Sequence, residues 1–316
     1  MGIARLLIGR IGIALLSLLI VSVGVFAITG ALPGDVAQEL LGQAATPEAV
    51  AGLRHAMGLD QPAWLRYFHW LGGMVVGDPG MSLVNQVPVA KLIGSRLPNS
   101  LLLAATTAAV SVPLALIIGI SSAMWRGSVY DRVVGVVSVS IVSVPEFLVA
   151  TTAVLIFAVH LHWLSALSYV DDIKSFQQFI RAFAMPVMTL CCVIVAQMAR
   201  LTRAAAVDQL DAPYVEMARL KGVGPVRIMF SHVLPNAIGP IANAVALSLS
   251  YLLGGVIIVE TIFNYPGIAK LMVDAVSTRD MPLVQACAML FCAAYLMLVL
   301  FADIAAIVSN PRLRHG

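Results

Sequence analysis

Apolar residues are gathered into six long stretches, separated by shorter segments that hold most of the charges. The stretches cover residues 9–31, 99–121, 133–159, 183–201, 239–262 and 283–308. A helix needs about 20 mainly apolar residues to cross a hydrocarbon layer about 30 Å thick, and each stretch is close to that length or longer. The pattern therefore predicts an all-α, polytopic membrane protein with six transmembrane helices.

The composition agrees with this fold class. Of the 316 residues, 60% are hydrophobic and 11% are charged, whereas about a quarter of a soluble domain is charged. The first stretch follows Arg5 and Arg10, as the apolar part of a signal peptide would. It is longer than most such parts, and no clear cleavage site follows it before Pro33. We therefore expect it to be retained as the first span.

Basic residues are unequally shared between the two sides of the predicted spans. The N-terminus, the loops 122–132 and 202–238 and the C-terminus hold eleven basic residues, counting the border residue Arg200, and four acids. The remaining segments hold eight basic residues and nine acids. Because Lys and Arg accumulate on the cytoplasmic side, both termini are predicted to be cytoplasmic. The predicted divisions are a cytoplasmic N-terminus (1–8), the first span (9–31), an extracytoplasmic segment (32–98), a core of five spans (99–308) that includes the cytoplasmic loop 202–238, and a cytoplasmic tail (309–316).

Two short helices are predicted in the extracytoplasmic segment. Thr46 can cap a helix whose first turn holds Pro47 and Glu48, and this helix should run to about Met57. The second should begin near Pro62. Its apolar face either lies at the membrane interface or packs on the ends of the spans. The residues on this face are Trp64, Tyr67, Phe68, Leu71, Met74 and Val75.

The cytoplasmic loop 202–238 is predicted to contain a short amphipathic helix between Pro213 and Gly222. A helix of about nine residues is too short to be stable alone in water, so it must pack on a surface. Such a helix suits docking into a groove on another protein. Its predicted shared face consists of Tyr214, Met217, Ala218 and Lys221.

A second short helix is predicted in the same loop, from Pro225 to a point before Pro235. Its predicted face consists of Val226, Met229 and Val233.

The same loop resembles the EAA motif of importer-type ABC transporter permeases. That pattern is Glu-Ala-Ala, three residues, Gly, nine residues, then Ile-x-Leu-Pro. Here Glu216, Ala218 and Gly222 keep the spacing, and Leu234-Pro235 closes it. Two positions depart from the pattern, because Met217 replaces an alanine and His232 replaces the isoleucine.

Other stretches are similar to the first permease of the peptide/nickel branch, which includes the dipeptide and oligopeptide permeases. The similar stretches are Leu32-Pro33-Gly34-Asp35, Gly58-Leu59-Asp60-Gln61-Pro62, Gly77-Asp78-Pro79-Gly80-Met81-Ser82, Arg96-Leu97-Pro98-Asn99-Ser100, Glu260-Thr261-Ile262-Phe263-Asn264-Tyr265-Pro266-Gly267 and Asn310-Pro311. The resemblance covers almost the whole chain.

The resemblance implies a type I ABC importer permease fold in a bacterial cytoplasmic (inner) membrane. It implies a heterodimer with a second permease, two ATP-binding subunits that hold ATP and Mg, and an extracytoplasmic substrate-binding protein. It also implies that the helix at 213–222 sits in a cleft of an ATPase and moves the spans when the ATPases close. The residues assigned to this coupling are Tyr214, Glu216, Met217, Ala218, Lys221, Gly222, Leu234 and Pro235. At Gly222 a Cβ is expected to obstruct the reversal of the chain.

No cofactor, metal site, nucleic-acid partner or catalytic residue is expected in this chain. None of the four Lys residues follows a Gly, so no phosphate-binding Gly-Lys-Ser/Thr sequence exists. Energy must therefore come from a gradient or from another subunit. His160 and His162 are two positions apart and cannot share a helical face. The four cysteines lie in apolar stretches, where free thiols fill helix packing, and are Cys191, Cys192, Cys287 and Cys292.

Three acids lie in or at the ends of the apolar stretches, where charge is costly. Glu146 follows Pro145, which should kink the third span. Glu146, or Glu260 with the nearby Asn264, could line a substrate path and meet a peptide ammonium group. The alternative for these acids is a buried hydrogen bond or a contact with the partner permease. Asp303 is expected to pair with a basic residue at the cytoplasmic end of the last span.

The leading hypothesis is thus a permease for di- or oligopeptides that is driven by partner ATPases. One alternative is a gradient-driven carrier that uses Glu146 or Glu260 as its proton-bearing group. Another, within the family, is an importer of nickel complexes. Glutathione and opine-like compounds also fall within the cargo range of this branch.

Overall fold

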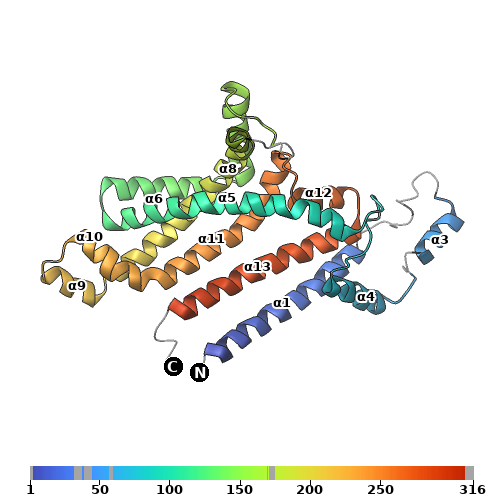
Figure 1. Cartoon of the computed structure of the whole chain (residues 1–316), viewed down its shortest axis with the longest axis horizontal. Coiled ribbons are helices and arrows are strands. Elements are labelled where there is room, and N and C mark those ends of the chain that lie inside the picture. Colours follow the sequence, from blue (N-terminus) through green and yellow to red (C-terminus); the bar gives the residue numbers. More distant parts are fainter. Residues whose placement is uncertain are drawn as a thin grey trace. The chain divides into compact units, whose positions relative to one another are not determined.

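The computed structural model describes residues 3–31, 38, 45–56, 60–168, 170 and 175–309. Every regular element in this part of the chain is a helix, and five helices are long and apolar enough to cross a membrane, or six if one bent pair is a single span. The predicted all-α class is confirmed. The chain divides into two compact units (Figure 1). Unit 1 is built mainly from Leu101–Tyr265, together with the N-terminal end of the first helix and the C-terminal end of the last. Unit 2 is built from Ala14–Ser100 and Pro266–Ala294.

Five of the six predicted spans lie within continuous helical segments. The fifth predicted span lies in a run that begins with α10 (Pro225–Ile228) and a π-helical segment, η3 (Met229–Val233). Several helices extend beyond the apolar stretches, and α5 begins ten residues earlier than its predicted span. The long helices are α1 (Ile3–Ala31), α5 (Val89–Met124), α8 (Phe176–Leu210), α11 (Leu234–Ile262) and α13 (Met281–Ser309).

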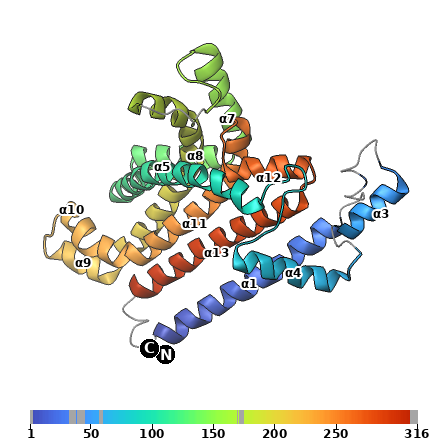
Figure 2. The same cartoon turned by 45° about the vertical axis from the view of Figure 1, so that its right-hand side comes forward.

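The third predicted span is broken. It consists of α6 (Val129–Val142), α7 (Glu146–Ala153), which is labelled in Figure 2, and the π-helical segment η2 (Val154–His160). The bend between α6 and the rest is 97°. The kink expected at Pro145 is present as a break between α6 and α7. Proline has no N–H to continue the hydrogen-bond ladder, and it disfavours a helical conformation for the residue before it.

The core of unit 1 is built around α8, which packs on α11, α6 and α7. Phe183 of α8 is buried and meets the ring of Tyr265 edge-on, with ring centroids 5.7 Å apart. At Gly119 of α5, a Cβ would lie 2.6 Å from the carbonyl oxygen of Ala199. The absence of a side chain there lets α5 approach the backbone of α8.

Unit 2 contains both predicted extracytoplasmic helices, α3 (Pro47–Ala56) and α4 (Ala63–Val76), so their existence is confirmed. It also contains α12 (Ile268–Ser277), an amphipathic helix that the apolar pattern did not single out. A buried apolar cluster joins the start of α5 to α12 and α13. Its buried members are Val89, Ile268, Ala275, Leu283, Ala286 and Cys287.

The predicted apolar face of α4 is divided between two environments. The hydroxyl of Tyr67 lies 2.8 Å from that of Ser22 in α1, and the ring of Tyr67 contacts that of Phe26 at a centroid distance of 5.5 Å. Trp70, which was not on the predicted face, also contacts Phe26, at 5.7 Å. Trp64 and Phe68 remain exposed. One row of α4 thus packs on a spanning helix, as one of the two expectations proposed, while Trp64 and Phe68 of the other row are exposed among the described residues.

The Gly-Asp-Pro-Gly-Met-Ser stretch forms a turn that is fastened to the start of α13. Its last residue, Ser82, donates a hydrogen bond to the fully buried carboxylate of Asp280, and the N–H of Leu83 donates to the same group at 3.1 Å. Gly77 and Gly80 adopt φ values of 84° and 90°, which residues with a side chain rarely adopt. The stretches Leu32–Asp35 and Asn310-Pro311, residues 58 and 59, and the tail lie outside the described residues.

We expect Asp280→Ala to destabilise the protein by about 1–3 kcal/mol, because it leaves the Ser82 hydroxyl and the Leu83 N–H buried without their acceptor. The midpoint of thermal unfolding of the purified protein in detergent measures this. Asp274→Ala is the matched control, since Asp274 is an exposed acid of α12 that pairs with Lys270 at 3.1 Å. An equal loss of stability in both variants would contradict the assignment.

Candidate functional site

The short helix predicted in the 202–238 loop is present as α9 (Pro213–Leu220), with Pro213 in its first turn. It ends in a Schellman motif, in which Gly222 N–H donates to Arg219 O at 2.9 Å and Val223 N–H to Ala218 O at 3.1 Å. Gly222 has φ of +78°, a conformation in which a Cβ would crowd the backbone of its own chain, although no atom beyond its chain neighbours lies within 4 Å of the Cβ position. Glycine suits this position because of its backbone conformation.

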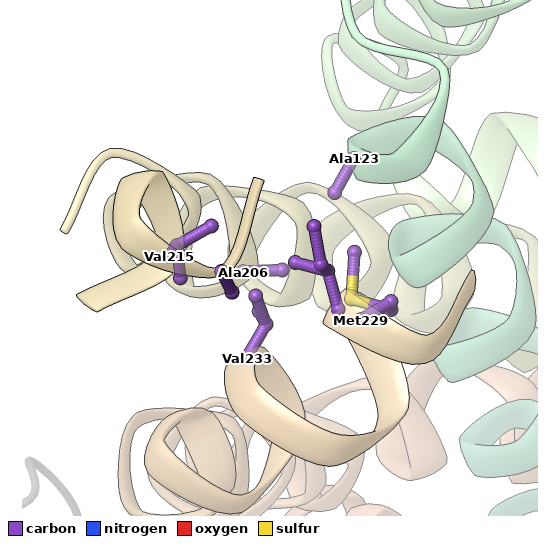
Figure 3. Close-up of a cluster of buried hydrophobic side chains, with 7 residues drawn as sticks. Ala123, Ala206, Val215, Met229 and Val233 are labelled. Carbon is purple, nitrogen blue, oxygen red and sulfur yellow. The ribbon is translucent and has the colours of Figure 1, made fainter. Parts of the chain in front are cut away.

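The inner face of α9 is formed by Val215 and Ala218, which are buried at 0% and 9% exposure. They lie in an apolar cluster together with Ala123 of α5 and Ala206 of α8 (Figure 3). The predicted face that grouped Ala218 with Tyr214, Met217 and Lys221 is wrong, because Ala218 points inward. The other members of the cluster are Ile228, Met229 and Val233.

The outer face of α9 is unusually apolar for an exposed surface. Tyr214, Met217 and Leu220 are 40%, 55% and 76% exposed, and they recur every three residues along the helix. Leu220 was not among the residues predicted for this face. Glu216, Lys221 and Gly222 are also exposed. Figure 1 shows α9 and α10 together at one end of unit 1.

The second short helix does not end before Pro235. The chain passes from α10 through η3 directly into α11, and Pro235 lies in the first turn of α11. In an α-helix the ring of Pro235 would clash with a carbonyl of the preceding turn. The preceding turn here is π-helical, with more residues in each hydrogen-bonded turn, so the helix can continue through the proline. Met229 and Val233 are buried as predicted, whereas Val226 is exposed.

Two ion pairs beside α9 were not predicted. The carboxylate of Asp131 in α6 is paired with the guanidinium of Arg203 in α8, whose Nη2 lies 2.8 Å from Oδ2. Arg126 donates through Nη1 to both oxygens of Asp211, at 2.8 and 2.9 Å. Partners 85 and 72 positions apart give no local spacing signal. The only hint in the sequence is that acids lie among the basic residues of the loops 122–132 and 202–238.

The three residues predicted for a substrate path lie in different environments. Glu146 is half-buried at the first position of α7, and its Oε2 lies 2.9 Å from where a Cβ of Gly255 in α11 would be. Glu260 is fully buried, and Asn264 is exposed in a turn with φ of +49°.

The remaining sequence expectations concern Asp303 and the histidines. Asp303 pairs with Arg10 of α1 at 3.0 Å, so the expected basic partner is confirmed. His160 and His162 are exposed at the end of η2, where Nδ1 of His162 lies 3.2 Å from the carbonyl oxygen of His160. Among the described residues, no group of three or more His, Cys, Asp or Glu side chains could hold a metal.

Comparison with known families accounts for both parts of the chain. Residues 115–315 match the binding-protein-dependent transport system inner membrane component, and residues 3–104 match the N-terminal part of such membrane components. The chain belongs to this permease family. It is therefore a multi-pass inner-membrane subunit of an ABC importer, and the alternative of a gradient-driven carrier is wrong.

Curated relatives give the same result. The chain is 36% identical over 299 residues to the glutathione transport system permease protein GsiC of Escherichia coli strain K12, with 95% of each chain covered. The GsiC proteins of E. coli O6:H1 (strain CFT073) and Salmonella choleraesuis (strain SC-B67) show the same identity and coverage. These relatives are transport permeases, and the resemblance to the peptide/nickel branch is confirmed.

We expect Gly222→Val to open the end of α9, because a β-branched residue at φ of +78° costs about 1–2 kcal/mol. Tryptic cleavage after Lys221 in native membranes should become about 5- to 30-fold faster if it follows the opened population. Gly222→Asn is the control, since asparagine tolerates this conformation. Equal cleavage rates in the Val and Asn variants would show that the backbone conformation at 222 does not hold this end.

Proposed function

We propose that this permease forms half of a translocation path for small peptides and receives motion from a partner ATPase through α9. The observation that carries the proposal is the contrast between the two faces of α9. Val215 and Ala218 fix the helix to unit 1, while Tyr214, Met217 and Leu220 present an apolar row to the outside. An apolar row on a short anchored helix is suited to a groove of another protein.

The energetics favour a protein partner for this row. Burial of one large apolar side chain stabilises a complex by about 1.5–3 kcal/mol. Leu220 is 76% exposed and Met217 55%, so binding of a partner would bury most of the surface of these side chains and release most of this free energy. The surplus of basic residues in the segments on the α9 side supports a cytoplasmic location, where an ATP-binding subunit would be available.

The other subunits follow from the proposed role. The second permease would complete the path, two ATP-binding subunits would hold ATP and Mg, and an extracytoplasmic binding protein would deliver the cargo. This chain would hydrolyse nothing itself. Its Glu216, Lys221, Leu234 and Pro235 belong to the coupling motif by resemblance, and both termini would be cytoplasmic.

Small peptides are the cargo that we propose. The relatives named above are glutathione permeases, and glutathione is a tripeptide with one ammonium group. Glu146 is the acid best placed to meet such a group. It follows directly on the break in the third span, it is half-buried rather than enclosed, and its carboxylate lies against Gly255, where a Cβ would meet it at 2.9 Å. Glu260, which is fully buried, and Asn264 remain weaker predictions for this path.

We expect Leu220→Glu to lower ATP-driven uptake about tenfold or more. A charged side chain in a desolvated groove would cost the roughly 1.4 kcal/mol that corresponds to a tenfold weaker association. The measurement is co-purification of the ATPase subunits and uptake by the complete transporter in proteoliposomes. Leu220→Met is the matched control and should behave like the parent protein. Unchanged uptake in the Glu variant would refute docking through this row.

We also expect Glu146→Gln to lower uptake of glutathione and of a dipeptide about tenfold, because the neutral amide cannot pair with the ammonium group. Uptake is measured with the complete transporter and radiolabelled substrates. N-acetylated dipeptide is the control, since it lacks the charge and its uptake should change little. An equal loss for both substrates would remove Glu146 from recognition. Uptake of a nickel complex without any peptide uptake would refute the cargo proposal.

A further inference from the structure

The turn between α5 and α6 is fastened to α8 by a fully satisfied buried acid. Asp131 is only 6% exposed. Its Oδ1 accepts from Ser122 Oγ at 2.6 Å and from Arg203 Nε, and its Oδ2 accepts from Gly127 N–H at 2.9 Å and from Arg203 Nη2 at 2.8 Å. A carboxylate with four donors in this geometry resists both stretching and rotation.

A second ion pair fastens the same turn at the point where α8 ends. Asp211 caps the C-terminus of α8, and α9 begins two residues later at Pro213. Arg126, the second residue after α5, holds this cap with two hydrogen bonds from one nitrogen. Arg126 therefore holds the base of α9 rather than the middle of α8.

Apolar packing completes the connection from the inside. Ala123, in the last turn of α5, lies in the buried cluster that also contains Val215 of α9. One turn earlier, Gly119 allows α5 to approach Ala199 and Thr202 of α8. The end of α5, the start of α6, the end of α8 and α9 thus share polar and apolar contacts within unit 1.

The geometry points to a transmission corner, made of Arg126, Asp131, Arg203 and Asp211, that carries the displacement of α9 into α6. In this role the four are positioning residues, and α6 is the lever. The far end of α6 is the 97° break that precedes Glu146. The inference rests on the proposed coupling function of α9 and adds the route by which its motion reaches the path.

The exposed pair Arg126–Asp211 and the buried pair Asp131–Arg203 allow an effect on coupling to be measured apart from an effect on stability. Arg126 and Asp211 are about half exposed, at 51% and 62%, and an exposed pair contributes little to static stability. If this pair carries displacement, its loss should affect coupling far more than unfolding. The buried pair would affect both, because removal of one partner leaves a buried charge.

The test is the number of substrate molecules imported per ATP hydrolysed, measured with the complete transporter in proteoliposomes with glutathione as the probe. Arg126→Gln should lower this ratio about 2- to 30-fold, the range found for residues within coupling networks, with little change in thermal midpoint. The exchanged pair Arg126→Asp with Asp211→Arg should restore it. Arg203→Lys keeps the charge but loses the paired hydrogen bonds, and it should lower the ratio as well.

Asp303→Asn is the matched control, because it breaks another interhelical ion pair of unit 1, to Arg10, without touching α8 or α9. An unchanged ratio in Arg126→Gln would overturn the inference, as would an equal fall in Asp303→Asn.

The Leu220→Glu variant distinguishes failure of this inference from failure of the proposed function. If Leu220→Glu abolishes uptake while Arg126→Gln leaves the ratio unchanged, the proposed function stands and only the transmission corner fails. If Leu220→Glu has no effect, the proposed function itself fails. Should Arg203→Lys not fold, the exposed pair decides the question alone.

Discussion

Burial of Val215 and Ala218 is the interaction on which the proposed coupling site depends. A helix of eight residues has too few internal hydrogen bonds to persist in water, so α9 exists only because the protein supplies a surface for it. That surface is assembled from the ends of α5 and α8 and from η3. Any displacement of α9 therefore requires these elements to move with it or the cluster to open, and close packing favours the first.

The same constraint explains the apolar character of the opposite face. A helix that is apolar on both sides would normally be buried entirely. On α9 the inner side is filled by two small residues, and the outer side carries two large side chains and Tyr214. Small residues allow a tight approach to α8, while large ones offer area to a partner. The division of sizes is what the proposed docking role requires.

The sequence pattern predicted most of the helices but few of their contacts. Long apolar runs specify spans because lipid requires them, and Pro213 and Gly222 mark the limits of α9. The inner face of α9 was misassigned because an apolar helix face can be covered either by the rest of the same chain or by a partner protein, and the sequence pattern does not distinguish the two. Pro235 was read as a stop, although the π-helical turn before it lets the helix continue. Asp131 and Arg203 meet across 72 positions, which no local spacing can predict.

The break in the third span determines what a motion of α6 can achieve. In a continuous helix, displacement at one end would shift the whole rod along its axis. With α7 turned by 97°, a shift of α6 along its own axis becomes a sideways push on the start of α7, where Glu146 lies. Gly255 of α11 has no side chain at this point, and the carboxylate lies in the space that a Cβ there would occupy, next to the side chain of Leu190. The position of the break thus places Glu146, the acid of this span, at the point where an axial movement of α6 would be turned sideways.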